Sequence, residues 1–98
     1  MEPIQSVRTR DQILVELRRL LSELLETDVT TVSEDLPLLD LITSSLAMVD
    51  GMRRVYDRFG VMISLRQIIE AQASLGVLAY DIETELKRRA KAGNKEKK

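Results

Sequence analysis

The sequence contains no cysteine and no histidine, and these absences exclude several kinds of chemistry. Without cysteine, the chain has no disulfide, no thiolate nucleophile and no zinc thiolate site. Without histidine, neither a Ser-His-Asp nor a Cys-His arrangement can be assembled. A carboxylate pair such as Asp40 and Asp50 remains for acid–base work, but nothing in the sequence places the two in one pocket. Any covalent chemistry therefore needs a reactive group supplied from outside the chain.

Aromatic residues are scarce, at 3% of the 98 residues, whereas hydrophobic residues make up 44%. The core is therefore built from Leu, Ile, Val, Met and Ala, a mixture that suits helices within a single domain. No apolar run approaches the roughly twenty residues of a membrane span. The N-terminus lacks the basic start and apolar core of a signal peptide, which predicts a cytoplasmic location. A net charge of −1 argues against a nucleic-acid-binding surface, so neither nucleic acid nor a membrane is an expected partner.

The spacing of apolar residues predicts an all-α fold, because each of four segments is apolar on one helical face. The predicted helices span about 10–26, 44–59, 65–70 and 75–89, so that three are longer and the third is short. Thr9 with Gln12 fits a capping box that opens the first helix, and Ser64 with Gln67 fits one that opens the third. Gly60 fits the C-terminal stop of the second helix.

The same spacing predicts which faces are buried. The expected buried face of the second helix is Val49, Met52, Val55, Tyr56 and Phe59. Leu46 and Met48 lie off this stripe and are expected to be partly exposed. Ile68 and Ile69 are expected to point inward from the third helix, and Ser74 to cap the fourth. The expected core face of the fourth helix is Leu75, Leu78, Ala79, Ile82 and Leu86.

Between Thr27 and Thr43 no helical period is sustained, which predicts a long first loop pinned onto the core by its apolar residues. Residues 29–32 are typical of a strand, but no partner strand appears. A connection of this length is unusual in so small a domain and tends to be functional. The prediction is a four-helix bundle over residues 9–90, with a flexible N-terminus at 1–8 and a disordered, lysine-rich tail at 91–98. Nucleic-acid contact through that tail stays open as an alternative.

Two adjacent hydroxyls, those of Ser44 and Ser45, lie at the predicted start of the second helix. A helix N-terminus offers free backbone N–H groups and the positive end of the helix dipole, so a phosphate attached there is stabilised. One interpretation is that the serines only cap the helix, which is their usual role at such a position. The other is that one of the two hydroxyls carries a group.

Three stretches bear on this choice. Residues 38–46 read Leu-Leu-Asp-Leu-Ile-Thr-Ser-Ser-Leu, residues 59–65 read Phe-Gly-Val-Met-Ile-Ser-Leu, and residues 73–79 read Ala-Ser-Leu-Gly-Val-Leu-Ala. They resemble three motifs of the acyl and peptidyl carrier proteins, most closely the peptidyl carriers of non-ribosomal peptide synthesis. Those motifs are Phe-Phe-x-Leu-Gly-Gly-(Asp or His)-Ser-Leu, Phe-Gly-Val-x-(Ile or Leu)-x-Leu and Pro-Thr-(Ile or Val)-x-x-Leu-Ala. The resemblance covers residues 10–87, nearly the whole predicted bundle.

The resemblance implies a non-catalytic carrier with an acyl-carrier-like helical bundle. In such carriers a transferase moves 4'-phosphopantetheine from coenzyme A to a serine, which by position is Ser45, with Ser44 as the rival site. The thiol of this arm holds an aminoacyl, peptidyl or acyl group as a thioester. Leu41, Leu46 and Met48 are then expected to contact partner enzymes.

The implied partners of such a carrier are a phosphopantetheinyl transferase, an adenylation or acyl-loading enzyme, and condensation, ketosynthase or tailoring enzymes. They belong to a non-ribosomal peptide or hybrid polyketide pathway, as in antibiotic biosynthesis. The chain starts with Met1 and ends just past the last predicted helix, which predicts a free-standing monomeric carrier. Excision from a larger synthase is the alternative.

The chain departs from the carrier signature just before Ser45. Ile42 and Thr43 replace two glycines, and Ser44 replaces the Asp or His. Ile42 removes the backbone freedom that glycine provides, while Ser44 is still able to cap a helix. Modification is then slow, dependent on a dedicated transferase, or lost. If it is lost, the chain is a degenerate, unmodified carrier-like module that acts as a protein-interaction scaffold.

Overall fold

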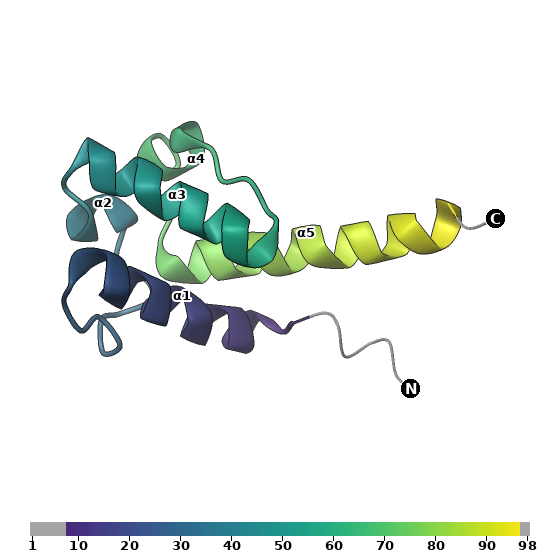
Figure 1. Ribbon diagram of the computed structural model, residues 1–98, viewed down its shortest axis with the longest axis horizontal. Coiled ribbons are helices and arrows are strands. Elements are labelled where there is room, and N and C mark those ends of the chain that lie inside the picture. Colours follow the sequence, from purple (N-terminus) through teal and green to yellow (C-terminus); the bar gives the residue numbers. More distant parts are fainter. Residues whose placement is uncertain (1–7, 97–98) are drawn as a thin grey trace.

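The computed structural model describes residues 8–96, and these residues form five helices without a strand. The helices are α1 (Arg10–Leu25), α2 (Leu38–Leu41), α3 (Ser45–Phe59), α4 (Leu65–Ile69) and α5 (Leu75–Glu96). Figure 1 shows α1, α3 and the first half of α5 side by side, with the short α2 at the left end of this group and the short α4 above α3. The predicted all-α bundle is confirmed.

α1 begins and ends through local chemistry that its sequence contains. The amide of Gln12 donates to the Thr9 hydroxyl at 3.2 Å, and the amide of Thr9 donates to the Gln12 side chain at 2.9 Å. This reciprocal capping box satisfies two backbone donors that have no partner within a helix. The helix ends at Leu25, and Glu26 follows with a left-handed φ of 54°.

The core forms where α1 packs against α3 and α5. Its largest fully buried side chains are Ile13, Leu17, Leu38, Leu75 and Ile82. They come from α1, α2 and α5, so the short α2 contributes to the core although it has only four residues. The apolar stripe predicted for the last helix is confirmed, with Leu86 partly buried at the edge of the core.

The buried face of α3 differs from the predicted one. Met48 is buried at 6% exposure, whereas Val49 and Tyr56 are about half exposed, at 53% and 50%. The prediction of a partly exposed Met48 was therefore wrong. The cause is Gly51, where α3 approaches α1 so closely that an added Cβ would lie 3.2 Å from the Leu24 side chain. This contact turns the helix so that Met48, Gly51, Val55 and Phe59 face inward.

The long connection between α1 and α3 is not entirely a loop, because residues 38–41 form α2. One helical turn is too short to show a sequence period, so the prediction missed it. The rest of the connection is fixed from α1: one guanidinium nitrogen of Arg18 donates to the carbonyl oxygens of Val29, Thr30 and Val32 at 2.5–3.3 Å. The predicted pinning of this loop onto the core is confirmed for the buried Leu38 and the partly buried Val32 and Leu41, whereas Leu39, also expected to pin it, is exposed.

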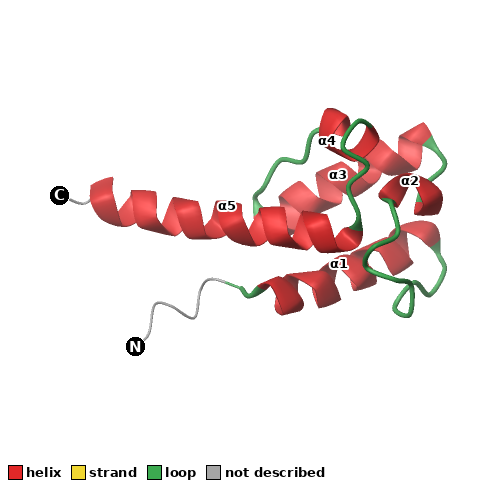
Figure 2. Cartoon of the chain, turned by 180° about the vertical axis from the view of Figure 1, so that it is seen from behind, coloured by secondary structure: helices red, strands yellow, loops and turns green. Residues whose placement is uncertain are grey.

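The connection also attaches to the start of α5. The Leu38 amide donates to the Ala73 carbonyl, and the Gly76 amide donates to the Glu34 carbonyl, both at 2.9 Å. Pro37 and Ser74 form an isolated bridge at the same place. Two segments far apart in sequence are thus held together directly before α2 and α5 begin, as Figure 2 shows from behind.

The remaining predictions concern α4 and the two ends of the chain. Ile68 is buried, but Ile69 is 49% exposed, because two consecutive residues of a helix point in directions about 100° apart. α5 continues to Glu96, past the predicted end near Arg89, and so includes part of the predicted disordered tail. Residues 1–7 and 97–98 lie outside the described residues, and the division into 1–8, 9–90 and 91–98 stays a prediction. In residues 8–96, no helix has the length and apolar character that crossing a membrane requires.

Candidate functional site at the start of α3

Ser44 is the N-cap of α3. Its backbone is extended, with φ −104° and ψ 133°, and its hydroxyl oxygen accepts a hydrogen bond from the Ala47 amide at 3.3 Å. Its carbonyl accepts the first helical bond, from the Met48 amide at 2.9 Å. Because the hydroxyl of Ser44 already satisfies a helix-end amide, it has a structural task.

Ser45 is the first residue of α3, and its side chain is exposed. Among the described residues, no hydrogen bond involves its hydroxyl. The structure thus separates the two hydroxyls that the sequence left as rivals. One caps the helix, and the other is accessible without a competing partner.

The end of α3 favours a negative charge beside Ser45. The amides of Ser45 and Leu46 have no acceptor in the described part of the chain, as expected for a first helical turn. The first turn of α3 contains no acidic side chain that would repel an anion. Free amides and the positive end of the dipole together stabilise a phosphate at such a position.

A surface hollow of about 160 Å³ adjoins the hydroxyl pair, and we call it the Ser45 hollow. It is lined by Leu39, Ile42, Thr43, Ser44, Ser45, Met48, Val49, Leu65 and Ile69. Apart from the three hydroxyl residues its lining is apolar, and it lies between α2, α3 and α4. Leu65 and Ile69 were not predicted as site residues, although their spacing of four places them on one face of α4.

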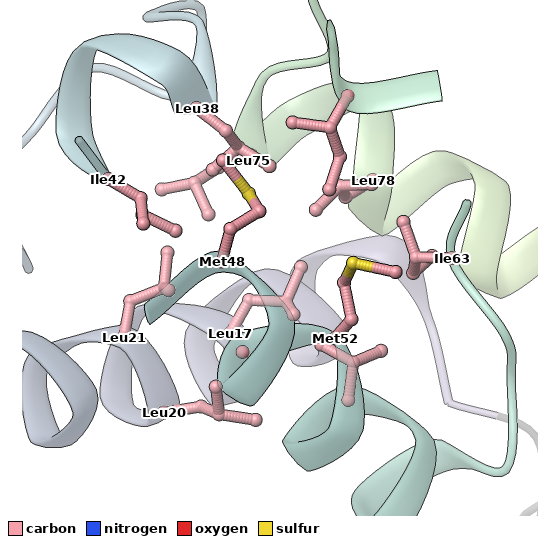
Figure 3. Close-up of a pocket in the computed structure, with 13 residues that line it drawn as sticks. Leu17, Leu20, Leu21, Leu38, Ile42, Met48, Met52, Ile63, Leu75 and Leu78 are labelled. Carbon is pink, nitrogen blue, oxygen red and sulfur yellow. The ribbon is translucent and has the colours of Figure 1, made fainter. Parts of the chain in front are cut away.

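A second, smaller space lies inside the bundle, and we call it the core cavity. Its volume is about 30 Å³, and all thirteen residues around it are apolar. Figure 3 shows Leu17, Leu38, Leu75 and other side chains pointing toward this space from α1, α2 and α5. Ile42 and Met48 belong to the lining of both the core cavity and the Ser45 hollow.

The predicted partner-contact residues differ in their accessibility. Leu46 is 83% exposed directly beside Ser45, which is the location predicted for it. Leu41 is only partly buried, at the end of α2. Met48 is buried, so its side chain offers almost no surface to a partner.

The carboxylate pair suggested as an acid–base alternative is not part of this site. Asp50 forms an ion pair with Arg54 at 3.4 Å on the outer face of α3. Asp40 is exposed on α2, and neither carboxylate lines the Ser45 hollow. In residues 8–96 no cluster of acidic side chains has the makeup of a metal site.

The comparisons with known proteins add one finding. A family model described as a phosphopantetheine attachment site matches residues 15–80, which include both serines and both spaces beside them. Searches among curated proteins and among solved structures gave no match.

Proposed function

The chain belongs to the phosphopantetheine attachment site family, and from this membership we propose that it is a carrier protein whose arm is attached to Ser45. Domains of this family hold 4'-phosphopantetheine covalently and act as carriers. The observation that supports Ser45 is the division of labour between the two serines. Ser44 is occupied in capping α3, and Ser45 presents an exposed hydroxyl at its first turn.

The attachment is a group transfer from coenzyme A. The Ser45 oxygen forms a bond to the phosphorus of the pantetheine phosphate, and the bond between that phosphorus and the bridging oxygen of the diphosphate breaks. Adenosine 3',5'-bisphosphate leaves, and the serine proton passes to a base of the transferase. The chain itself has no histidine or cysteine, so both the base and the thiol come from outside it.

The residues around Ser45 fit a phosphate attached to its hydroxyl and the apolar part of the arm that follows. The amides of Ser45 and Leu46, which have no acceptor among the described residues, are available to a phosphate, and no carboxylate lies in the first turn of α3. The apolar lining of the Ser45 hollow offers a surface to the methyl and methylene groups of the arm. When attached, the arm supplies a terminal thiol that holds an acyl or aminoacyl group as a thioester.

We further propose that the carrier serves a non-ribosomal peptide or hybrid polyketide pathway from the cytoplasm, as a monomer. Its partners would be the transferase, an adenylation or acyl-loading enzyme, and condensation, ketosynthase or tailoring enzymes. Supporting this choice, large apolar side chains are exposed near Ser45, namely Leu46 and Val49 on α3 and Ile69 on α4, and the first turn of α3 has no acidic residue. A partner enzyme with an apolar contact surface matches them better than a strongly basic one.

Intact-mass measurement tests the attachment site. The protein is incubated with coenzyme A and a broad-specificity phosphopantetheinyl transferase, alongside Ser45→Ala and Ser44→Ala variants. We expect the wild type and Ser44→Ala to gain the mass of one phosphopantetheine and Ser45→Ala to gain none. Gain in Ser45→Ala with none in Ser44→Ala would assign the arm to Ser44 instead.

A second candidate function is an unmodified carrier-like scaffold. It is favoured by Ile42, which is buried where carriers usually have glycine, and by the exposed Leu46, which suits a protein contact without an arm. An unchanged mass with several transferases, the native pathway's included, would support the scaffold and contradict the carrier.

A further inference from the structure

The Ser45 hollow and the core cavity are neighbours that share two lining residues, Ile42 and Met48. All other lining residues belong to one space alone. Both shared side chains are buried, at 4% and 6% exposure. Ile42 and Met48 therefore stand between the surface beside Ser45 and the interior of the bundle, and we call them the partition.

The two residues of the partition are held by their backbones. The Ile42 amide donates to the Leu38 carbonyl at 2.8 Å, and the Met48 amide donates to the Ser44 carbonyl at 2.9 Å. Isoleucine is branched at Cβ and has few accessible rotamers, whereas methionine has three rotatable bonds and adapts its shape. Ile42 is therefore the fixed member of the partition, and Met48 is the adaptable one.

The volumes of the two spaces decide which one accepts a ligand. The core cavity measures about 30 Å³, far below the roughly 150 Å³ of an apolar cavity that binds one benzene molecule. Its lining offers no polar side chain, so even one water would lack hydrogen-bond partners there. The Ser45 hollow measures about 160 Å³ and contains the hydroxyl pair. A group of several carbon atoms fits the Ser45 hollow but enters the core only if the partition moves.

We propose that Ile42 and Met48 keep the carried group out of the core and confine it to the Ser45 hollow. This inference rests on the proposed function, because it needs an arm on Ser45. It also assigns a role to the departure of Ile42 from the glycine of the carrier signature, since glycine has no side chain to close the passage. The carried group is then a short acyl or small aminoacyl group, and a longer alkyl chain stays in water.

Methyl NMR of the loaded wild-type protein tests the inference without any mutation. Acetyl-, hexanoyl- and octanoyl-phosphopantetheine are attached from the corresponding coenzyme A thioesters, and loading is verified by intact mass. Leu17 and Leu75 line only the core cavity, whereas Leu39 and Val49 line only the Ser45 hollow. We expect chemical-shift changes that grow with chain length at Leu39 and Val49 and are absent at Leu17 and Leu75. Shifts at Leu17 and Leu75 that grow with chain length would overturn the partition.

Two variants test the residues of the partition. In Ile42→Ala we expect the octanoyl group to shift the Leu17 and Leu75 methyls and to raise the thermal midpoint above that of the acetyl form. Val77→Ala is the matched control, because Val77 is exposed on α5 and lines neither the hollow nor the core cavity, and we expect the wild-type pattern. If the NMR spectrum of Ile42→Ala lacks dispersion because the variant does not fold, the same measurement on the milder variant Ile42→Val and on the loaded wild type tests the role of Ile42. Unchanged core methyls in a folded Ile42→Ala would contradict the role of Ile42.

Failure of the inference is distinguishable from failure of the proposed function. A wild-type protein that gains no mass lacks the arm, and the proposed function then fails. A protein that gains the mass but shows chain-dependent shifts at Leu17 and Leu75 is a carrier without a partition.

Discussion

At the scale of single residues, two neighbouring serines have different roles because the backbone changes from extended at Ser44 to helical at Ser45. Ser44 is extended, so its hydroxyl turns back to the Ala47 amide, and Ser45 is already helical. An N-cap side chain satisfies a donor that a helical residue at the next position cannot reach. The structural role and the proposed chemical role therefore belong to adjacent residues and do not compete for one hydroxyl.

This division predicts different effects on stability. Ser44→Ala removes the N-cap and is expected to lower the free energy of unfolding by about 1 kcal/mol. Ser45→Ala changes an exposed side chain without a hydrogen bond, so we expect a change within about 0.5 kcal/mol. Urea unfolding of both unmodified variants measures the two values. A larger loss in Ser45→Ala than in Ser44→Ala would contradict the assignment of the cap.

At the scale of elements, α1 and α3 each end at a residue in the left-handed region. Gly60 ends α3 with φ 74°, and its amide donates to the Tyr56 carbonyl at 2.7 Å. Glu26 ends α1 with φ 54°, although it has a side chain that disfavours this conformation. The same type of helix end is thus unstrained in α3 and strained in α1.

Substitutions at these two positions are expected to have opposite effects. A Cβ added at residue 60 would lie 3.6 Å from its nearest neighbour, a side-chain nitrogen of Arg89, so it would not clash. Gly60→Ala is therefore expected to lower the free energy of unfolding only by the backbone strain, about 1–2 kcal/mol. Glu26→Gly relieves such strain and is expected to raise the free energy of unfolding by up to about 1 kcal/mol. Denaturant unfolding of the two variants provides the comparison. If both substitutions change the free energy of unfolding in the same direction, backbone strain does not determine stability at these positions.

At the scale of the whole molecule, α1 is central, because α3 and α5 both pack on it. The short α4 is tied to this group by buried Ile68 and by a hydrogen bond from the Gln67 side chain to the Asp81 carboxylate. Burial raises the pKa of Asp81 above its usual range. The tie between α4 and α5 therefore contains a carboxylate whose charged form is disfavoured by folding.

The raised pKa of Asp81 predicts a pH dependence. Between the unfolded and the folded pKa, the folded state binds more protons, so the free energy of unfolding falls as pH rises through this window. Asp81→Asn lacks this titration, so its stability relative to the wild type is expected to increase from about pH 4 to pH 7. Urea unfolding across this range measures the difference. A difference that stays constant with pH would contradict the burial effect.

Asp28→Asn serves as the control with the opposite sign. Hydrogen bonds from the Thr30 side chain and amide lower the pKa of Asp28, so its contribution to stability is present at neutral pH and is lost as pH falls through the folded pKa. The stability of Asp28→Asn relative to the wild type is therefore expected to decrease as pH rises toward the ordinary Asp pKa of 3.8, and to stay level from there to pH 7.

The sequence alone determined the features that depend on neighbouring residues. Thr9 with Gln12 placed the start of α1, and Gly60 placed the end of α3, because capping involves residues only three or four positions apart. The three motifs at residues 38–46, 59–65 and 73–79 also indicated the carrier family, because each is a run of adjacent residues and their order lies in the chain itself. The capping box predicted for α4 forms by half, because the Gln67 amide donates to the Ser64 hydroxyl. This bond also joins residues only three positions apart.

Only the tertiary structure decided the features that depend on distant segments. The close approach of α3 to Leu24 at Gly51 turned Met48 into the core and Val49 outward, and a glycine gives no apolar signal in a sequence. The four-residue α2 forms where Leu38 is fixed by its hydrogen bond to Ala73. The position of Ile42 between the Ser45 hollow and the core cavity likewise depends on α1, α4 and α5. Capping hydrogen bonds join residues that are close in the sequence, so the sequence predicts them. Burial and enclosed space arise only where separate helices pack together, so only the tertiary structure shows them.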